Sequence, residues 1–104
     1  MSSAGAVSAR RLEAEVAAAI RSLSRWPGVR RIWLFGSAAR GADCLDWRSD
    51  LDFAVEGMSD EVYCRAWAEL DEAVQLPVDL VRWEVANSTL RDQIAQWGRI
   101  IYGA

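Results

Sequence analysis

The stretch from Arg31 to Arg40 reads RIWLFGSAAR and decides the fold. Its aromatic and β-branched first half predicts a strand over 29–35, and Gly36-Ser37 ends that strand. Residues 38–40 are expected to form one helical turn. Glycine lets the backbone approach a ligand closely, and a helix start presents free N–H groups to an anion. Gly36 and Ser37 are therefore candidate anion-binding residues, although such a turn alone predicts no more than a tight bend.

A second informative stretch, Ser49–Val55, reads SDLDFAV and predicts a strand over 51–55. Residues two apart on a strand point to the same face, so the carboxylates of Asp50 and Asp52 should project together. Two neighbouring anions repel each other, and burying them without a counter-charge is costly, whereas a divalent cation removes both problems. A solvated pair of acids is the alternative. The apolar residues around the pair favour a ligand role.

A third strand, predicted over 78–83 after Pro77, contains Asp79. Strand propensity disfavours aspartate, and a charge among apolar neighbours needs a partner, a metal ion or water. An exposed edge position is the alternative for this residue taken alone. Three aspartates lie on two predicted strands, and Gly36-Ser37, a candidate phosphate-binding turn, follows another. Together they predict a Mg²⁺ site that is held by carboxylates and faces a triphosphate. Such a site suits metal-assisted phosphoryl or nucleotidyl transfer.

Helices are expected between these strands, because apolar residues recur there at intervals of three and four. The predicted helices cover 8–25, 59–74 with Ser59 as N-cap, and 88–97 with Ser88 as N-cap, and 99–102 is a short edge strand. The order α-β-α-β-α-β-α-β predicts an α/β (α+β) fold with a small mixed sheet of three to four strands covered by helices. Residues 1–6 are expected to be a flexible tail and 7–104 one domain.

Composition excludes several classes of site. The 104 residues contain no histidine, which rules out Ser–His–Asp and Cys–His catalysis and imidazole metal ligands. The net charge of −3 argues against a nonspecific nucleic-acid binder, so no direct contact with nucleic acid is expected. Cys44 and Cys64 are too far apart in sequence for a paired zinc motif and are expected to be reduced. With no signal peptide and no membrane-length apolar run, the expected location is cytoplasmic.

The six tryptophans are expected to fill a small core for the most part. Trp33, Trp67, Trp83 and Trp97 lie on predicted strands or helix stripes and are assigned to the core. Tryptophan is also enriched among residues that anchor partner proteins. Trp26 and Trp47, in a turn and a loop, are the two expected to be exposed.

Three motifs carry a resemblance to a known family, namely FGSAARG at 35–41, SDLDFAV at 49–55 and VDL at 78–80. Together they resemble the minimal nucleotidyltransferases of the DNA polymerase beta-like superfamily. The resemblance covers nearly the whole chain, because GRIIY at 98–102 is similar to the short final strand of the family. One departure is the segment between Ser37 and Asp50, which is two residues longer than the family usually shows. The resemblance implies the polymerase beta-like nucleotidyltransferase fold.

The resemblance also implies roles for the acidic residues. Asp50 and Asp52 would hold two Mg²⁺ ions. Asp79 would share one ion and serve as the base that deprotonates the attacking hydroxyl, which agrees with the absence of histidine.

On the nucleotide side, the resemblance implies that Gly36 and Ser37 hold the β- and γ-phosphates of ATP. Arg40 is a further candidate for contact with phosphate, with a solvated arginine as the alternative.

The family includes antitoxins that transfer AMP from ATP to a tyrosine hydroxyl of a HEPN ribonuclease toxin. The resemblance therefore implies a Mg²⁺-dependent nucleotidyltransferase, more narrowly a protein adenylyltransferase, that forms a hetero-oligomeric complex with a HEPN toxin. The short chain has no added domain for another acceptor, which agrees with an acceptor supplied by a partner. The alternative is a non-catalytic antitoxin that neutralises its partner by direct contact, with Trp26 or Trp47 as anchors. Because all three carboxylates are present, the enzyme is preferred.

Overall fold

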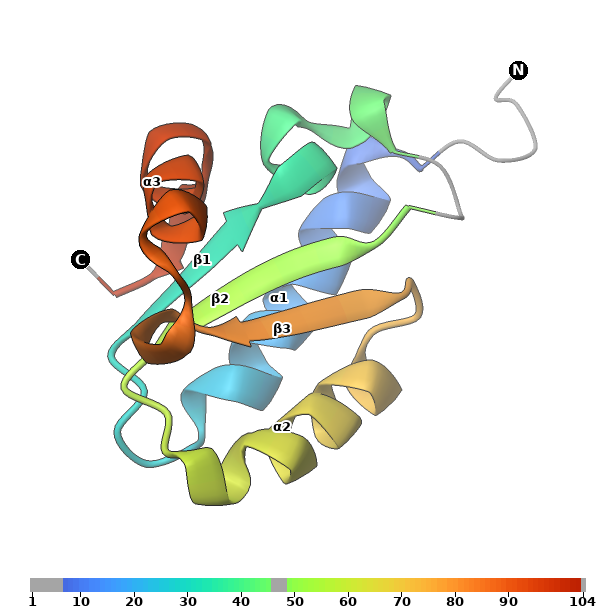
Figure 1. Cartoon of the computed structure of the whole chain (residues 1–104). Helices are drawn as coiled ribbons and strands as arrows, with labels where there is room; N and C mark the ends of the chain where they lie inside the picture. Colours follow the sequence, from blue (N-terminus) through green and yellow to red (C-terminus); the bar gives the residue numbers. More distant parts are fainter. Residues whose placement is uncertain (1–6, 46–48, 104) are drawn as a thin grey trace.

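The computed structural model describes residues 7–45 and 49–103, and its helices and strands alternate in the predicted order (Figure 1). The elements are α1 (Ala9–Ser24), β1 (Arg31–Phe35), β2 (Leu51–Glu56), α2 (Asp60–Ala73), β3 (Val78–Arg82), α3 (Ser88–Trp97) and β4 (Arg99–Tyr102). Short 3-10 helices lie between them at η1 (Gly36–Arg40), η2 (Ala42–Cys44) and η3 (Trp83–Val85). The expectations for residues 1–6 and for Trp47 fall outside the described residues.

The four strands form one mixed sheet in the order β3-β2-β1-β4, which confirms the predicted fold class. β1 is antiparallel to both β2 and β4, whereas β2 is parallel to β3. The parallel pair is joined through α2, as a parallel connection needs a crossover. Because β1 is antiparallel to its neighbour β2, the last residues of β1 lie at the same end of the sheet as the first residues of β2 and β3.

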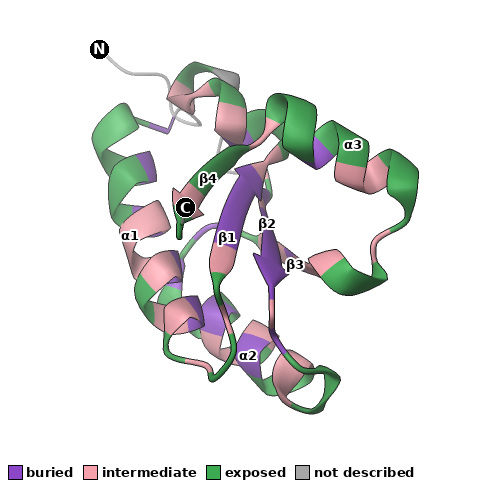
Figure 2. Ribbon diagram, turned by 90° about the vertical axis from the view of Figure 1, so that its left-hand side faces the viewer, coloured by how far each residue is buried: buried purple, intermediate pink, exposed green. Residues whose placement is uncertain are grey.

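The two faces of the sheet differ in what covers them. Figure 2 shows α1 and α2 on one side of the strands and α3 on the other. Leu51, Phe53 and Val55 of β2 are fully buried in the larger core, which residues of α1 and α2 also form. Since side chains alternate along a strand, Asp52 and Ala54 point to the α3 side. That side holds only a small apolar cluster and leaves part of the sheet open.

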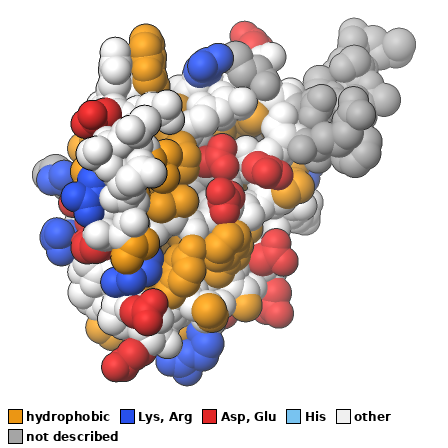
Figure 3. All heavy atoms as spheres, viewed as in Figure 1, with side chains coloured by type: hydrophobic (Ala, Val, Ile, Leu, Met, Phe, Trp, Pro, Cys, Tyr) orange, Lys and Arg blue, Asp and Glu red, His pale blue; other side chains and the backbone are white. Residues whose placement is uncertain are grey.

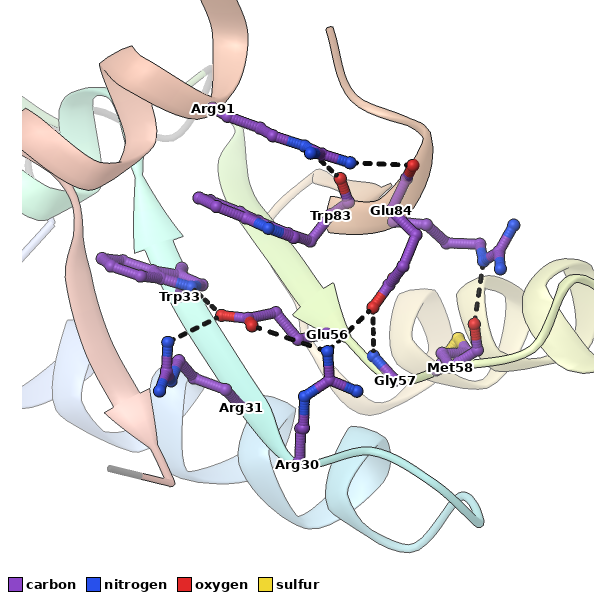
Figure 4. A network of polar contacts seen from close by, with 10 residues as sticks. Arg30, Arg31, Trp33, Glu56, Gly57, Met58, Trp83, Glu84 and Arg91 are labelled. Carbon is purple, nitrogen blue, oxygen red and sulfur yellow. Dashed lines mark hydrogen bonds and ion pairs between the residues drawn. The ribbon is translucent and has the colours of Figure 1, made fainter. Parts of the chain in front are cut away.

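A network of aromatic and polar contacts fixes α3 to this second face, near Glu56 at the end of β2 (Figure 4). The rings of Trp33 and Trp83 stack with centroids 5.6 Å apart. The guanidinium of Arg91 on α3 lies over the Trp83 ring, and its Nε donates to the Trp83 carbonyl at 2.8 Å. The indole of Trp33 donates to Glu56 at 2.7 Å, and Arg31 pairs with the same carboxylate. The helix is thereby held in place over β1.

The predicted burial of two tryptophans, Trp97 and Trp26, is wrong. Trp97 is 67% exposed, because the cluster beneath α3 consists of Trp33, Ala54 and Ile94 and does not extend to the last residue of the helix. Trp26 is half buried and packs against the larger core, and its indole nitrogen is enclosed without a hydrogen-bond partner in the described structure. A turn residue can be buried because the turn itself folds back onto the core.

One of the two predicted helix caps differs from expectation. The N-cap of α3 is Asn87, whose side-chain oxygen accepts from the Leu90 backbone N–H at 2.8 Å, and Ser88 is the first helical residue. Asparagine satisfies a free N–H at a helix start as well as serine does. Ser59 is the N-cap of α2, but its side chain makes no capping hydrogen bond. Within the described residues, no helix combines the length and apolar character needed to cross a membrane.

Candidate functional site

The three predicted acids meet at the start of the parallel strands, on the open face of the sheet. Asp52 of β2 lies directly opposite Asp79 of β3 in the parallel register, and Asp50 immediately precedes β2. The backbone N–H of Leu51 donates to the Pro77 carbonyl at 2.8 Å, which ties the starts of the two strands together. Figure 3 shows acidic side chains gathered on this face over β2 and β3. The fold thus brings the three acids, which lie on separate segments of the sequence, together on one acidic surface.

Gly36 brings the phosphate-type turn against these acids. In the antiparallel register Phe35 lies opposite Asp52, so the turn after β1 begins beside that carboxylate. Gly36 adopts a φ of +71°, and a Cβ atom built there would lie 2.3 Å from Oδ2 of Asp52. The backbone conformation favours glycine, and a Cβ atom here would displace the Asp52 carboxylate. Ser37 follows on the surface as part of η1, which is only five residues long.

Burial and mutual repulsion make Asp52 the most perturbed acid of the site. The pKa of Asp52 is raised from its ordinary value of 3.8 to about 6, first by burial of the carboxyl group and then by the charges of Asp79 and Asp50. The charges of Asp79 and Asp50 thus disfavour the ionised form of Asp52. A cation between them would relieve that repulsion.

The donor set fits Mg²⁺, since this ion binds carboxylate oxygens. As the side chains stand, however, no group of three or more acidic, cysteine or histidine side chains in the described part of the chain is arranged to hold a metal ion. Asp50 is exposed, whereas Asp52 and Asp79 are half buried. The structure therefore provides the residues and their mutual repulsion, and their closure around an ion would need a movement of side chains.

The last predicted site residue, Arg40, lies beside a hollow of about 400 Å³. The hollow is lined by Phe35, Gly36 and Arg40 from one side and by Gln93 and Trp97 of α3 from the other. The prediction from sequence missed both residues of α3. The helical spacing of Trp97 predicts a core residue. Gln93 carries no signal in the sequence, because only the fold brings α3 next to η1.

Tyr63 of α2 is a further residue next to the acids. Its hydroxyl donates to the carbonyl of Leu80, the residue after Asp79. The pKa of Tyr63 is raised by burial and further by the charges of Asp79 and Cys64, while Arg82 lowers it. From α2, Tyr63 therefore supports β3 next to Asp79. No sequence signal distinguishes this contact from ordinary core packing.

Comparison with known families decides what this arrangement is. The family model described as polymerase beta, nucleotidyltransferase matches residues 18–104. The chain belongs to this family. The match includes the Gly36 turn and all three aspartates, so the predicted family is confirmed. Nucleotidyl transfer is the reaction after which the family is named. Among curated protein sequences, none matches the chain.

Solved structures of this polymerase beta nucleotidyltransferase fold agree with the assignment. A chain from a toxin–antitoxin complex with AMP-PNP is 25% identical with a TM-score of 0.71, and the match covers 86% of this chain and 72% of that one. A protein named as a minimal nucleotidyltransferase is 27% identical with a TM-score of 0.62, over 86% and 88%. A chain from the complex of tri-AMPylated Shewanella oneidensis HEPN toxin with MNT antitoxin is 23% identical with a TM-score of 0.66, over 93% and 74%.

The raised pKa of Asp52 predicts how the metal-free nucleotidyltransferase responds to pH. The folded chain keeps a proton on Asp52 up to about pH 6, whereas the unfolded chain loses it near 3.8, so stability falls as the pH rises through this window. Asp52→Asn removes the ionisation. The side chain is half exposed, so screening reduces the penalty, and we expect a gain of about 1 kcal/mol, or about 4 to 8 °C in Tm, above pH 6.

The measurement is a set of thermal melts in EDTA between pH 4 and pH 8. Near pH 4 the difference in Tm between the variant and the wild type should be small, because Asp52 is protonated in the folded chain and only about half ionised in the unfolded chain. Asp71→Asn, at an exposed acid of α2, is the control. An equal gain in Tm at pH 4 and pH 8 would contradict the assignment.

Proposed function

We propose that this chain transfers AMP from ATP to a tyrosine hydroxyl of a HEPN ribonuclease toxin and thereby acts as its antitoxin. The observation that carries the proposal is the acidic surface of Asp50, Asp52 and Asp79 beside the Gly36 turn. This is the arrangement that a carboxylate-held cation and a triphosphate require. We infer a cytoplasmic location, where ATP and the RNA cleaved by such a toxin are found.

The relatives support the choice of substrate and partner. The structure that is 25% identical is a toxin–antitoxin complex that contains AMP-PNP, an analogue of ATP. The structurally similar S. oneidensis complex contains an AMPylated HEPN toxin together with an MNT antitoxin. We infer that this chain likewise forms a hetero-oligomer with a HEPN toxin and uses ATP.

In this proposal the acidic residues hold the metal ions and the Gly36 turn binds the phosphates. Two Mg²⁺ ions, held by Asp50 and Asp52 with Asp79 sharing one of them, would stabilise the charge that develops on the phosphates. The backbone of Gly36 and the hydroxyl of Ser37 bind the β- and γ-phosphates. A side chain at position 36 would displace the Asp52 carboxylate.

The reaction is balanced as a displacement at the α-phosphorus. The tyrosine oxygen of the acceptor forms a bond to the α-phosphorus, and the bond from that phosphorus to the bridging oxygen of the β-phosphate breaks. Pyrophosphate leaves with the bonding electrons. The proton of the tyrosine hydroxyl goes to the carboxylate of Asp79, which lies on β3 at the edge of the sheet, where an acceptor from another chain can approach. Arg40 contacts the phosphates on the side of the nucleotide opposite the acceptor.

The test of this proposal separates catalysis from simple binding. The toxin is co-expressed with wild-type chain or with Asp79→Asn, which keeps the size of the side chain and removes the base. A catalytic antitoxin loses neutralisation in the variant, although the two chains still co-purify. If Asp79→Asn neutralises the toxin at equal dose, the chain acts as a binding module, with the exposed Trp97 as the first candidate anchor.

A further inference from the structure

The hollow between η1 and α3 has the chemistry of an anion site. The two elements lie side by side over the end of β1 (Figure 1). Arg40 contributes a permanent positive charge, while the amide of Gln93 and the indole N–H of Trp97 are hydrogen-bond donors. Of the described residues that line the hollow, none is acidic. It therefore contrasts with the acidic surface on the other side of Gly36.

The order of the strands gives the hollow its place in the reaction. In phosphoryl-type transfer the attacking and leaving oxygens lie roughly in line on opposite sides of the phosphorus. The strands are adjacent in the order β3-β2-β1. Asp79 lies on β3, Asp52 lies on β2, which begins directly after Asp50, and Gly36 follows β1. An acceptor over β3 and an α-phosphate over β2 therefore direct the leaving group across β1, toward the hollow.

We infer that Gln93 and Trp97 of α3, together with Arg40, extend the phosphate site of the Gly36 turn and bind the pyrophosphate that leaves the nucleotide. The inference rests on the proposed nucleotidyl transfer and adds α3 to the site. Pyrophosphate carries the negative charge that develops in the reaction, and cationic and N–H donors stabilise such charge. A volume of about 400 Å³ leaves room for two phosphate groups and their water.

The wall formed by α3 is fixed in place before any ligand binds. Arg91 donates to the carbonyls of Trp83 and Glu84, both at 2.8 Å, and Trp83 stacks on Trp33 of β1 (Figure 4). Donors that are already positioned need no reorganisation when charge develops. The backbone of α3 that carries Gln93, two residues after Arg91, is therefore held at the rim of the hollow by contacts that do not involve the ligand.

The experiment places a negative charge at the rim. Gln93→Glu changes the side chain by one charge at an exposed position, and Gln96→Glu makes the same change at an exposed residue of α3 that does not line the hollow. Binding of magnesium pyrophosphate and of AMP is measured by calorimetry. We expect Gln93→Glu to weaken pyrophosphate binding by about tenfold or more through charge repulsion, with AMP binding and the Gln96→Glu variant close to wild type.

A second measurement uses the exposed indole. Trp97→Phe should abolish the change in tryptophan fluorescence on addition of magnesium pyrophosphate, because Trp97 would contact the ligand directly. Equal pyrophosphate affinity in Gln93→Glu and Gln96→Glu would overturn the inference, and so would AMP binding that weakens as much as pyrophosphate binding, which would place the nucleoside in the hollow. If the inference fails while the partner is still labelled by ATP, the proposed function stands. If neither ATP nor pyrophosphate binds the wild type, both fail.

Discussion

Replacing Asp50 and Asp52 together by Asn is expected to lower the rate of AMP transfer by about 1000-fold or more. Asparagine keeps the size of each side chain but removes the two negative charges that would hold the cation. A loss of this size corresponds to about 4 kcal/mol of transition-state stabilisation, which is typical when electrostatic stabilisation of developing charge is removed. The rate is measured as AMP incorporated into the partner at saturating Mg²⁺ and ATP.

The fold of this double variant should be intact. Burial and the charges of Asp79 and Asp50 already raise the pKa of Asp52, so loss of its charge relieves repulsion in the metal-free protein. The matched control combines Asp71→Asn with Glu72→Gln, which removes the same net charge from two exposed residues of α2. A double Asn variant that retains more than about a tenth of the wild-type rate would show that the acids are not the catalytic centre.

Gly36→Ala adds one methyl group and is expected to lower the rate of AMP transfer more than any other change of this size in the site. The added Cβ would lie 2.3 Å from Oδ2 of Asp52, so the carboxylate must move, and the φ of +71° is unfavourable for alanine. The backbone conformation alone costs about 1 to 2 kcal/mol of stability. Since a misplacement of about 1 Å can lower a rate about 100-fold, we expect a loss of that order in transfer.

Gly41→Ala is the matched control for this variant. Gly41 also has a positive φ, +113°, but a Cβ built there meets no atom within 4 Å. Alanine at this position should therefore lower Tm through backbone strain and leave the transfer rate within a few-fold of wild type. Thermal melts and transfer rates of both variants separate strain from displacement of Asp52. Equal loss of activity in the two variants would contradict the role of the Gly36–Asp52 contact.

The sequence predicts the local parts of this fold well, because local patterns determine them. The alternation of β2 places Leu51 and Phe53 in the core and Asp52 on the opposite face, and the structure confirms it. The strand before Gly36 and the helices at three- and four-residue spacing also lie where the patterns predict. In each of these cases the nearest neighbours in sequence already decide which side of the element is buried.

The parts that the sequence does not reveal depend on contacts between distant segments. The approach of Gly36 to Asp52 follows from the antiparallel register of β1 and β2, and the spacing of residues does not encode that register. Trp97 has the helical spacing of a core residue, yet it is exposed because the buried cluster under α3 does not reach the end of the helix. Gln93 belongs to the site only because α3 lies beside η1.

Transfer of label from ATP to the partner is the direct test of AMP transfer by this chain. The chain and its HEPN partner are incubated with Mg²⁺ and ATP labelled either at the α-phosphate or at the γ-phosphate, and the proteins are separated. We expect α-label on the partner, at a tyrosine, and the γ-label that leaves ATP only in pyrophosphate. Absence of α-label on the partner under conditions in which ATP binds, or the appearance of γ-label there, would contradict AMP transfer by this chain.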